Sequence, residues 1–201
     1  MELSRRQIVG AGASIAATAW VAPSVLALDR VAAATGSDVC ENPQMLVSAS
    51  WEDPPPLDLD KNTGIESDDE VFVFFEQGPV ALEKDIKINR VTEGSFNGKS
   101  EQNVEFLAGT VVCSHFVHAN RIDDTDTPLT GSLTFPNATI LGLIYRSGEL
   151  KKADFLEVPG TDYEYDNAET EDLFTWSGGT LSWSLVPGNE VRGIRILTEC
   201  P

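Results

Sequence analysis

The chain contains two histidines, His115 and His118, whose spacing is the first pattern in it that suits metal chemistry. On a helix, residues three apart share a face and can bind one ion together. The residues around them are rich in valine and phenylalanine, which favours a strand, and side chains three apart in a strand point to opposite faces. We therefore expect no shared zinc site, with one histidine packed inward and the other at the surface.

Two acidic segments carry oxygen ligands at spacings that suit calcium. Calcium takes several hard oxygens at alternate positions, with a glycine for the sharp turn. In the first segment the glycine, Gly64, comes one position late, and no helix is predicted beside it. The alternative interpretation is a pair of solvated acidic loops. The candidate calcium ligands are Asp58, Asp60 and Asn62 in the first segment and Asp123, Asp124 and Asp126 in the second.

A third acidic segment, residues 159–171, contains Tyr163 and Tyr165. A tyrosine ring stacks on a sugar while neighbouring carboxylates accept its hydroxyl protons. These two tyrosines are therefore the candidate ligand-binding aromatics. The tryptophans Trp51, Trp176 and Trp183 belong to strand candidates, and their more frequent role there is packing in the core.

No combination of residues identifies a catalytic site. Ser114 adjoins His115, but neighbours along a strand point apart, and the chain has no Gly-x-Ser-x-Gly motif. Paired carboxylates that cleave glycosides stay open as an alternative, because the chain has 32 Asp and Glu and nothing singles out a pair. We predict no catalytic residue.

The chain has three cysteines, Cys40, Cys113 and Cys200, so at least one has no partner within the chain. Their spacing matches no zinc motif. Cys40 and Cys200 flank the predicted domain, whose ends are expected to lie close together, whereas Cys113 sits in an apolar strand candidate. We predict a Cys40–Cys200 disulfide with Cys113 reduced; the rival pairing is Cys40–Cys113.

The N-terminal segment predicts export. Arg5 and Arg6 precede an apolar, Ala- and Gly-rich stretch that is free of charge until Asp29, and small residues lead up to Ala34. These are the parts of a twin-arginine signal peptide. We expect residues 1–34 to be removed and residues 35–201 to form a single domain outside the cytoplasm. The competing interpretation is a retained membrane anchor.

The rest of the chain predicts an all-β fold, an antiparallel β-sandwich of jelly-roll type with about nine strands. Apolar runs and alternating patterns are separated by Gly, Pro and Asn turns. One short helix is expected over residues 149–157. The strand candidates are residues 44–51, 70–77 with a continuation over 79–91, 103–107, 110–119, 130–135, 138–146, 173–177, 180–186 and 191–198.

From residue 66 to residue 200 the sequence resembles a group of exported bacterial β-domains without an established activity, of the kind found in high-GC Gram-positive bacteria. The resemblance implies a β-sandwich fold and an extracellular location, and it carries over no catalytic residue. It rests on residues 66–68 (ESD), 71–77 (VFVFFEQ), 109–118 (GTVVCSHFVH), 129–135 (LTGSLTF), 140–144 (ILGLI) and 159–163 (PGTDY), together with 19–23 (AWVAP) near the N-terminus.

The charge balance limits the partners of this protein. A net charge of −18 repels nucleic acid and anionic membranes, so we expect neither as a partner once the signal peptide is removed. The leading hypothesis is a secreted, non-catalytic binding or surface-interaction module for a cell-wall or extracellular glycan or protein. The alternative is a secreted carbohydrate-active enzyme of jelly-roll type that uses paired carboxylates. Calcium is the one cofactor that the acidic loops suggest.

Overall fold

The computed structural model describes residue 40 and residues 43–200. The predicted signal peptide lies outside the described residues. Among the described residues, no helix is both long and apolar enough to cross a membrane. Strands dominate the structure, and the predicted all-β class is confirmed.

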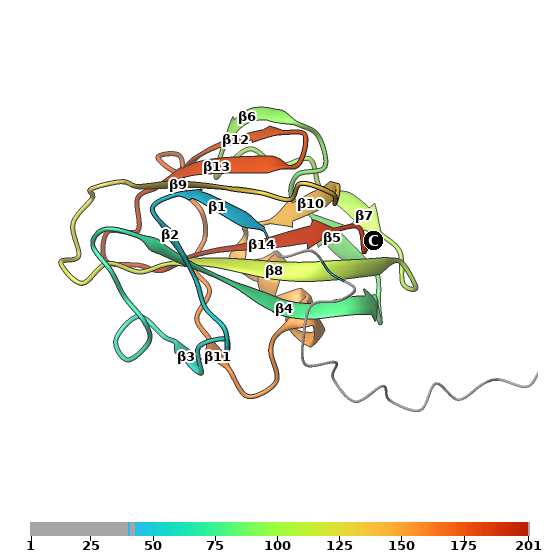
Figure 1. Ribbon diagram of the computed structural model, residues 1–201, viewed down its shortest axis with the longest axis horizontal. Helices are drawn as coiled ribbons and strands as arrows, with labels where there is room; N and C mark the ends of the chain where they lie inside the picture. Colours follow the sequence, from blue (N-terminus) through green and yellow to red (C-terminus); the bar gives the residue numbers. More distant parts are fainter. Residues whose placement is uncertain (1–39, 41–42, 201) are drawn as a thin grey trace, which may run out of the picture. The chain divides into compact units, whose positions relative to one another are not determined.

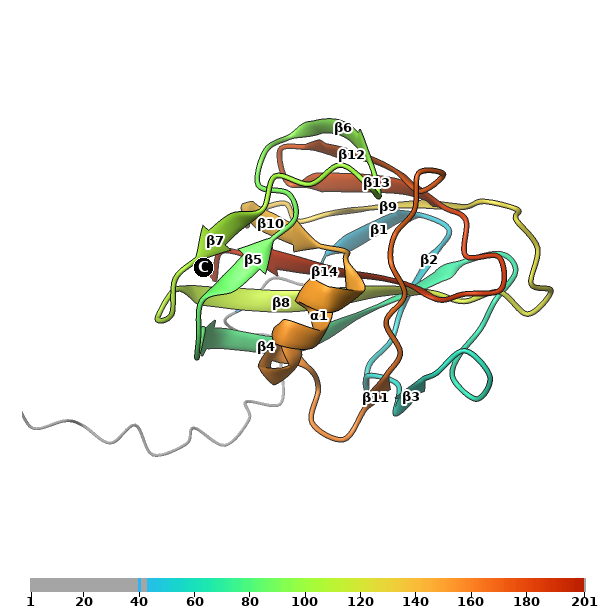
Figure 2. The same ribbon diagram turned by 180° about the vertical axis from the view of Figure 1, so that it is seen from behind.

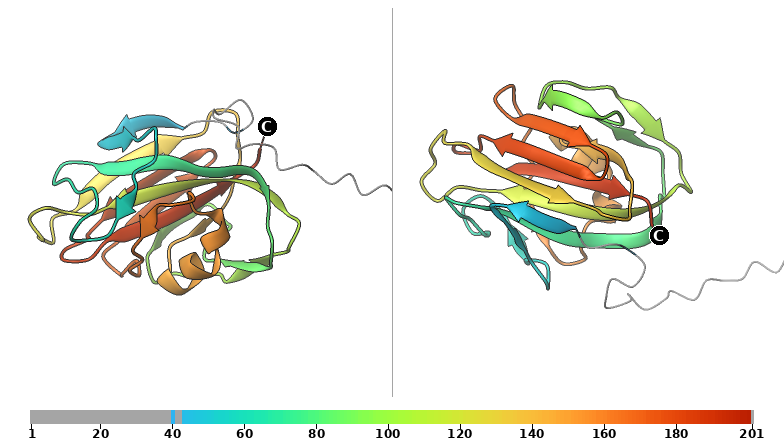
Figure 3. Two further views of the ribbon diagram at one scale, coloured as in Figure 1. Left: turned by 90° about the horizontal axis from the view of Figure 1, so that it is seen from below. Right: turned by 45° about the horizontal axis from the view of Figure 1, so that its top comes forward.

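The first of two five-stranded sheets has the order β1-β9-β13-β12-β6, with neighbouring strands antiparallel. Figure 3, right, shows these strands side by side. Their bounds are β1, Gln44–Val47; β6, Gly94–Asn97; β9, Leu129–Thr134; β12, Leu173–Ser177; and β13, Thr180–Leu185.

The second sheet has the order β10-β14-β8-β4-β2 and is antiparallel except for the parallel pair β2–β4 (Figure 1). The edge strand β2 follows β1 directly in the sequence, so the chain passes from the first sheet to the second at Ser48. The bounds are β2, Ala49–Trp51; β4, Val71–Ala81; β8, Val111–Ala119; β10, Ile140–Ile144; and β14, Arg192–Thr198.

A first hydrophobic core lies between the two sheets, because strands of both contribute alternate apolar residues to it. Strand β13 shows the pattern most clearly: Leu181, Trp183 and Leu185 are buried, while the intervening serines are half-buried on the other face. Trp176 and Trp183 are core residues, as predicted. The same core takes Val117 and Ile194 from the second sheet.

A second core covers the opposite face of the second sheet, so the molecule is more than a two-layer sandwich. It is built from the helix α1 (Ser147–Lys152), the 3-10 helix η1 (Asp154–Leu156) and two small strand pairs. Figure 2 shows α1 in front of β8 and β14. The pairs are β3 (Asp58–Leu59) with β11 (Asp162–Tyr163), parallel, and β5 (Ile86–Ile88) with β7 (Val104–Phe106), antiparallel.

Several predicted boundaries are corrected by the structure. The described residues form strands labelled β1 to β14, more than the nine expected. The strand predicted over 44–51 divides at Ser48, a turn separates β4 from β5 within 79–91, and β3, β6 and β11 form outside the predicted strands. Strand β6 lies between the predicted strands 79–91 and 103–107, and its only buried side chain is Phe96. The helix predicted over 149–157 is divided into α1 and η1 at Ala153.

Candidate functional site

A polar hollow of about 310 Å³ opens where the β3–β11 pair meets α1. It gathers residues that are far apart in the sequence: Asp60 after β3, Lys151 on α1, and the run from β11 onward. Four carboxylates and two tyrosines line it beside a single ammonium group. The lining residues are Asp60, Lys151, Asp162, Tyr163, Glu164, Tyr165 and Asp166.

Hydrogen bonds from backbone amides hold three of these carboxylates in place, and for Glu164 and Asp166 the amide belongs to a distant segment. Oε2 of Glu164 accepts a hydrogen bond from the Lys61 amide at 2.6 Å, and Oδ2 of Asp166 accepts one from the Val191 amide at 3.2 Å. Each carboxylate keeps a second oxygen for another partner. Strand β11 is fixed to β3 by the pairing of Asp162 with Asp58, which places the two acidic segments side by side.

The two tyrosines predicted as ligand aromatics form the inner wall of this hollow rather than free platforms. Tyr165 is buried, and its ring stacks on that of Tyr163 with centroids 5.6 Å apart. Both rings also contact Phe116 in the second core. Burial raises the pKa of both phenols well above the usual value, so both hydroxyls stay protonated.

Behind the tyrosines lies a buried ion pair that the sequence analysis missed. Arg195 is fully buried, and its guanidinium binds Glu76 through two hydrogen bonds of 2.7 Å. The same guanidinium donates to the hydroxyl of Tyr165, which itself donates to Glu157. Ser114 donates to Glu76 at 2.6 Å. The network anchors the hollow to β4, β8 and β14. In the sequence, its only sign was a charged residue, Glu76 or Arg195, within an apolar strand pattern.

In the first predicted calcium segment, the carboxylates accept hydrogen bonds from other residues of the same segment. Asp58 accepts hydrogen bonds from the Asp60 amide at 2.8 Å and from the Thr63 hydroxyl at 2.7 Å, and these bonds lower its pKa. Asp60 accepts one from the Asn62 amide at 2.8 Å. These are turn-forming contacts of short acidic side chains.

The second predicted calcium segment is organised by a cation. Arg121 forms hydrogen bonds to both carboxylate oxygens of Asp123, at 2.7 and 3.0 Å, and holds the pKa of Asp123 below its usual range. Lys61 lies 3.6 Å from Asp124, so the two segments are neighbours. Across the described part of the chain, however, no three Asp or Glu carboxylates gather closely enough to form a preformed metal site. Calcium binding stays a prediction.

The two histidines of β8 face opposite sides of the second sheet, but both are buried, so the expectation of one surface histidine is wrong. The ring of His115 packs against Phe75 and Phe135, with centroids 5.3 and 4.8 Å away. On the other side, Nε2 of His118 lies 3.2 Å from the carbonyl of Ile65. Desolvation lowers the pKa of His118 to about 4. The first sheet covers one face of this sheet and the second core covers the other, so neither histidine reaches the surface.

All three cysteines meet at one point. Their sulfur atoms lie within 4.8 Å of one another, and this is the only close group of three or more Cys, His, Asp or Glu side chains in the described region. Cys113 lies in the middle: its Cα is 6.0 Å from that of Cys40 and 5.6 Å from that of Cys200. These distances allow Cys113 to pair with either neighbour, and the sulfur atoms of Cys40 and Cys200 are also only 3.8 Å apart. The predicted Cys40–Cys200 disulfide therefore stays a prediction.

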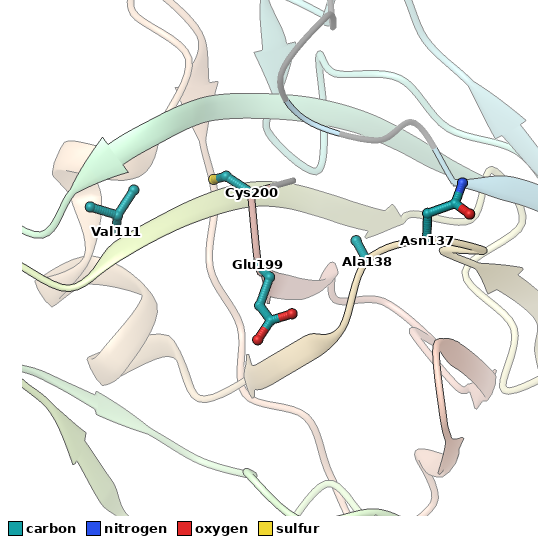
Figure 4. Close-up of a pocket in the computed structure, with 5 residues that line it drawn as sticks. All are labelled: Val111, Asn137, Ala138, Glu199 and Cys200. Atoms are coloured by element: carbon teal, nitrogen blue, oxygen red, sulfur yellow. The ribbon is translucent and has the colours of Figure 1, made fainter.

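Beside the cysteines lies a second hollow, of about 320 Å³. Figure 4 shows the five residues that line it, with the side chains of Glu199 and Cys200 leaving the chain in different directions. Cys200 is half-buried, whereas Cys40 and Cys113 are buried. The lining residues are Val111, Asn137, Ala138, Glu199 and Cys200.

The outer face of the first sheet is uncharged along four of its strands. Along β6, β9, β12 and β13 the outward positions carry hydroxyl groups, with Asn97 and the exposed Leu173 as the exceptions. Two neighbouring pairs are in contact: Ser95 with Thr175 at 3.2 Å and Thr134 with Thr180 at 2.8 Å. These four strands therefore present no carboxylate on that face. Its hydroxyl residues are Ser95, Thr130, Ser132, Thr134, Thr175, Ser177, Thr180, Ser182 and Ser184.

No protein-family model matches the chain, and neither a curated protein nor a solved structure matches it.

Proposed function

We propose that this protein is an exported, non-catalytic binding module, and that the hollow between β3, β11 and α1 binds an extracellular glycan bearing free amino groups. The observation that carries the proposal is the convergence of four carboxylates and two tyrosines on one hollow that contains a single lysine. Such a lining attracts a cation, and its carboxylates also accept hydrogen bonds from sugar hydroxyls.

The rigidity of the hollow supports a binding role. Tyr165 is fixed by Arg195 and Glu157, and Glu164 is fixed by the Lys61 amide, so little side-chain ordering remains to be completed when a ligand enters. The enzyme alternative needs two carboxylates on an open face beside exposed aromatics. Strands β6, β9, β12 and β13 present no carboxylate on the outer face of the first sheet, whereas the hollow gathers four, so the hollow is where we look for such a pair.

The test is calorimetric titration with a glucosamine oligomer and with its fully N-acetylated counterpart of equal length. We expect binding of the glucosamine oligomer only, weakened by salt. The variants Asp162→Asn and Glu164→Gln should each weaken it about tenfold, the loss expected for one charge-assisted hydrogen bond.

A matched control separates the hollow from general attraction to an acidic protein. Glu105 on β7 is exposed and does not line the hollow, so Glu105→Gln removes one charge elsewhere. It should leave the affinity unchanged. An equal loss in all three variants, or equal binding of both oligomers, would contradict the proposal. Release of shorter oligomers, abolished by one of the two hollow variants, would establish the enzyme alternative.

A further inference from the structure

The three cysteines occupy a site that the fold brings together from distant segments. Cys113 lies in β8, and Cys200 follows the neighbouring strand β14, where Thr198 is the register partner of Cys113. Cys40 precedes β1 and is 3 % exposed. The separations of Cys113 from its neighbours, 6.0 and 5.6 Å between Cα atoms, both fall within the range for a disulfide.

A sulfur atom can form only one disulfide, so at most two of the three cysteines are joined at any time. The third is then a thiol held against the bond, because all three sulfurs lie within 4.8 Å and those of Cys40 and Cys200 are 3.8 Å apart. A thiolate in contact with a disulfide is the arrangement from which exchange proceeds. Elsewhere in the described chain no such arrangement occurs.

The opposite strand leaves room for the three sulfurs. Strand β4 departs from regular pairing with β8 between Gln77 and Val80, and Gly78 lies in this irregular stretch. A Cβ atom at Gly78 would lie 2.7 Å from the sulfur of Cys40 and 2.9 Å from that of Cys113. Both contacts are shorter than packing allows, so only glycine leaves the sulfur atoms the space that they occupy.

The three thiols differ in their access to solvent. Cys40 and Cys113 are buried, while Cys200 is half-buried and lines the hollow in Figure 4. When Cys40 and Cys113 are joined, the thiol left over is the one that reaches solvent. When Cys113 and Cys200 are joined, the thiol left over is buried at Cys40.

We propose that Cys40, Cys113 and Cys200 form a thiol–disulfide exchange site in which Cys113 is the shared partner and Cys200 is the outlet to solvent. In the internal step the Cys200 thiol loses its proton to water, and its thiolate attacks the sulfur of Cys113. The Cys113–Cys200 bond forms as the Cys40–Cys113 bond breaks, and the Cys40 thiolate takes up a proton. Nothing is oxidised or reduced overall.

The same outlet takes a small external disulfide. The Cys200 thiolate attacks one sulfur of that disulfide, a mixed disulfide forms on Cys200, and the other half leaves as a thiolate that takes up a proton. Glu199 lines the same hollow and the chain carries a net charge of −18. The external disulfide that fits is therefore cationic, since an anionic one is repelled.

Peptide mapping without reduction tests the internal step. The protein is kept at pH 8 and then quenched with acid, which stops exchange. Each chain should then contain one thiol and one disulfide, and the map should show both Cys40–Cys113 and Cys113–Cys200, each from a part of the molecules. Iodoacetamide added to the folded protein before quenching should label Cys200 and leave Cys40–Cys113 as the only disulfide. A map with Cys40–Cys200 as the sole disulfide would overturn the proposal, as would three thiols, the result expected of a metal–thiolate site.

Single-residue variants provide a matched set. Cys40→Ser and Cys200→Ser should each retain one disulfide through Cys113 and contain no thiol, and neither should react with iodoacetamide. Two free thiols in either variant would show that Cys113 is not a shared partner.

The outlet is tested with cystamine, which is cationic, and with dithiodipropionate, which is anionic. At low ionic strength cystamine should add one half-molecule to Cys200 at least tenfold faster, and the ratio should fall towards one in molar salt. Addition at Cys40, or no addition of either reagent to the folded protein, would refute the role of Cys200.

Discussion

The substitution Glu76→Gln should destabilise the protein strongly, because it leaves Arg195, the most deeply buried cation among the described residues, without a counter-ion. Arg195 has no exposed surface and Glu76 is 5 % exposed. The guanidinium makes two hydrogen bonds to that carboxylate at 2.7 Å, and its Nη1 donates to the carbonyls of Leu150 and Ala153 at 3.3 and 2.9 Å. Glutamine keeps the shape of the side chain and one acceptor, but removes the charge.

The expected cost follows from the geometry of the pair. Removing one partner of a buried ion pair costs about 3–5 kcal/mol, since the remaining charge cannot be hydrated. For a domain of this size, each kcal/mol lowers the melting temperature by about 2–4 °C, so the melting temperature should fall by about 6–20 °C. Replacing both Glu76 and Arg195 with methionine should cost less than replacing Glu76 alone, because no unpaired charge is then left.

Urea unfolding followed by tryptophan fluorescence, with thermal melts in parallel, measures the effect. Glu190→Gln is the matched control: Glu190 accepts a hydrogen bond from Arg192 at 2.6 Å, but its side chain is 49 % exposed. That pair should contribute no more than about 1 kcal/mol. If Glu76→Gln costs less than about 1 kcal/mol, or no more than the control, the buried pair does not stabilise the second core as argued.

Three further outcomes are expected. Gly78→Ala should lower stability by about 1–3 kcal/mol and raise the free thiol count, because the new Cβ would lie 2.7 Å from the Cys40 sulfur; an unchanged melt and thiol count would contradict this. The pKa of His118 is lowered to about 4, below that of a histidine in the unfolded chain. As the pH falls from 7 to 5, the unfolded chain therefore binds a proton first, and the free energy of unfolding should fall by about 2 kcal/mol. The variant His118→Gln should not show this pH dependence. Millimolar calcium should raise the melting temperature slightly relative to chelator if an acidic loop binds it; identical melts would remove the calcium prediction.

Local patterning made the all-β class predictable. In β13 the alternation of apolar residues with serines fixes which side faces the core, because successive side chains in a strand point to opposite faces. Strand β8 is buried along nearly its whole length, as a strand covered on both sides requires, whereas the sequence predicted one of its histidines at the surface. Both histidines are buried because layers pack on both faces of the second sheet. The local sequence around residues 115–118 does not predict this.

The candidate sites were predicted only in part. Tyr163, Tyr165 and Asp60 were singled out by residue type, yet their meeting around one hollow depends on the parallel pairing of β11 with β3, two strands of two residues each. Lys151 was not singled out, since an exposed lysine on a short helix has no local signature. The buried Glu76–Arg195 pair joins residues 119 positions apart.

The sequence by itself determined the all-β class, the alternation that separates core from surface, and the odd number of cysteines, because each of these depends on residue types and on neighbours along the chain. Tertiary structure alone decided that a second layer covers the second sheet, that two acidic segments share a hollow, and that Cys113 lies between Cys40 and Cys200. These features arise from contacts between segments up to 160 residues apart. Such contacts are selected by the packing of whole sheets, and the residues that make them carry no mark of their distant partners.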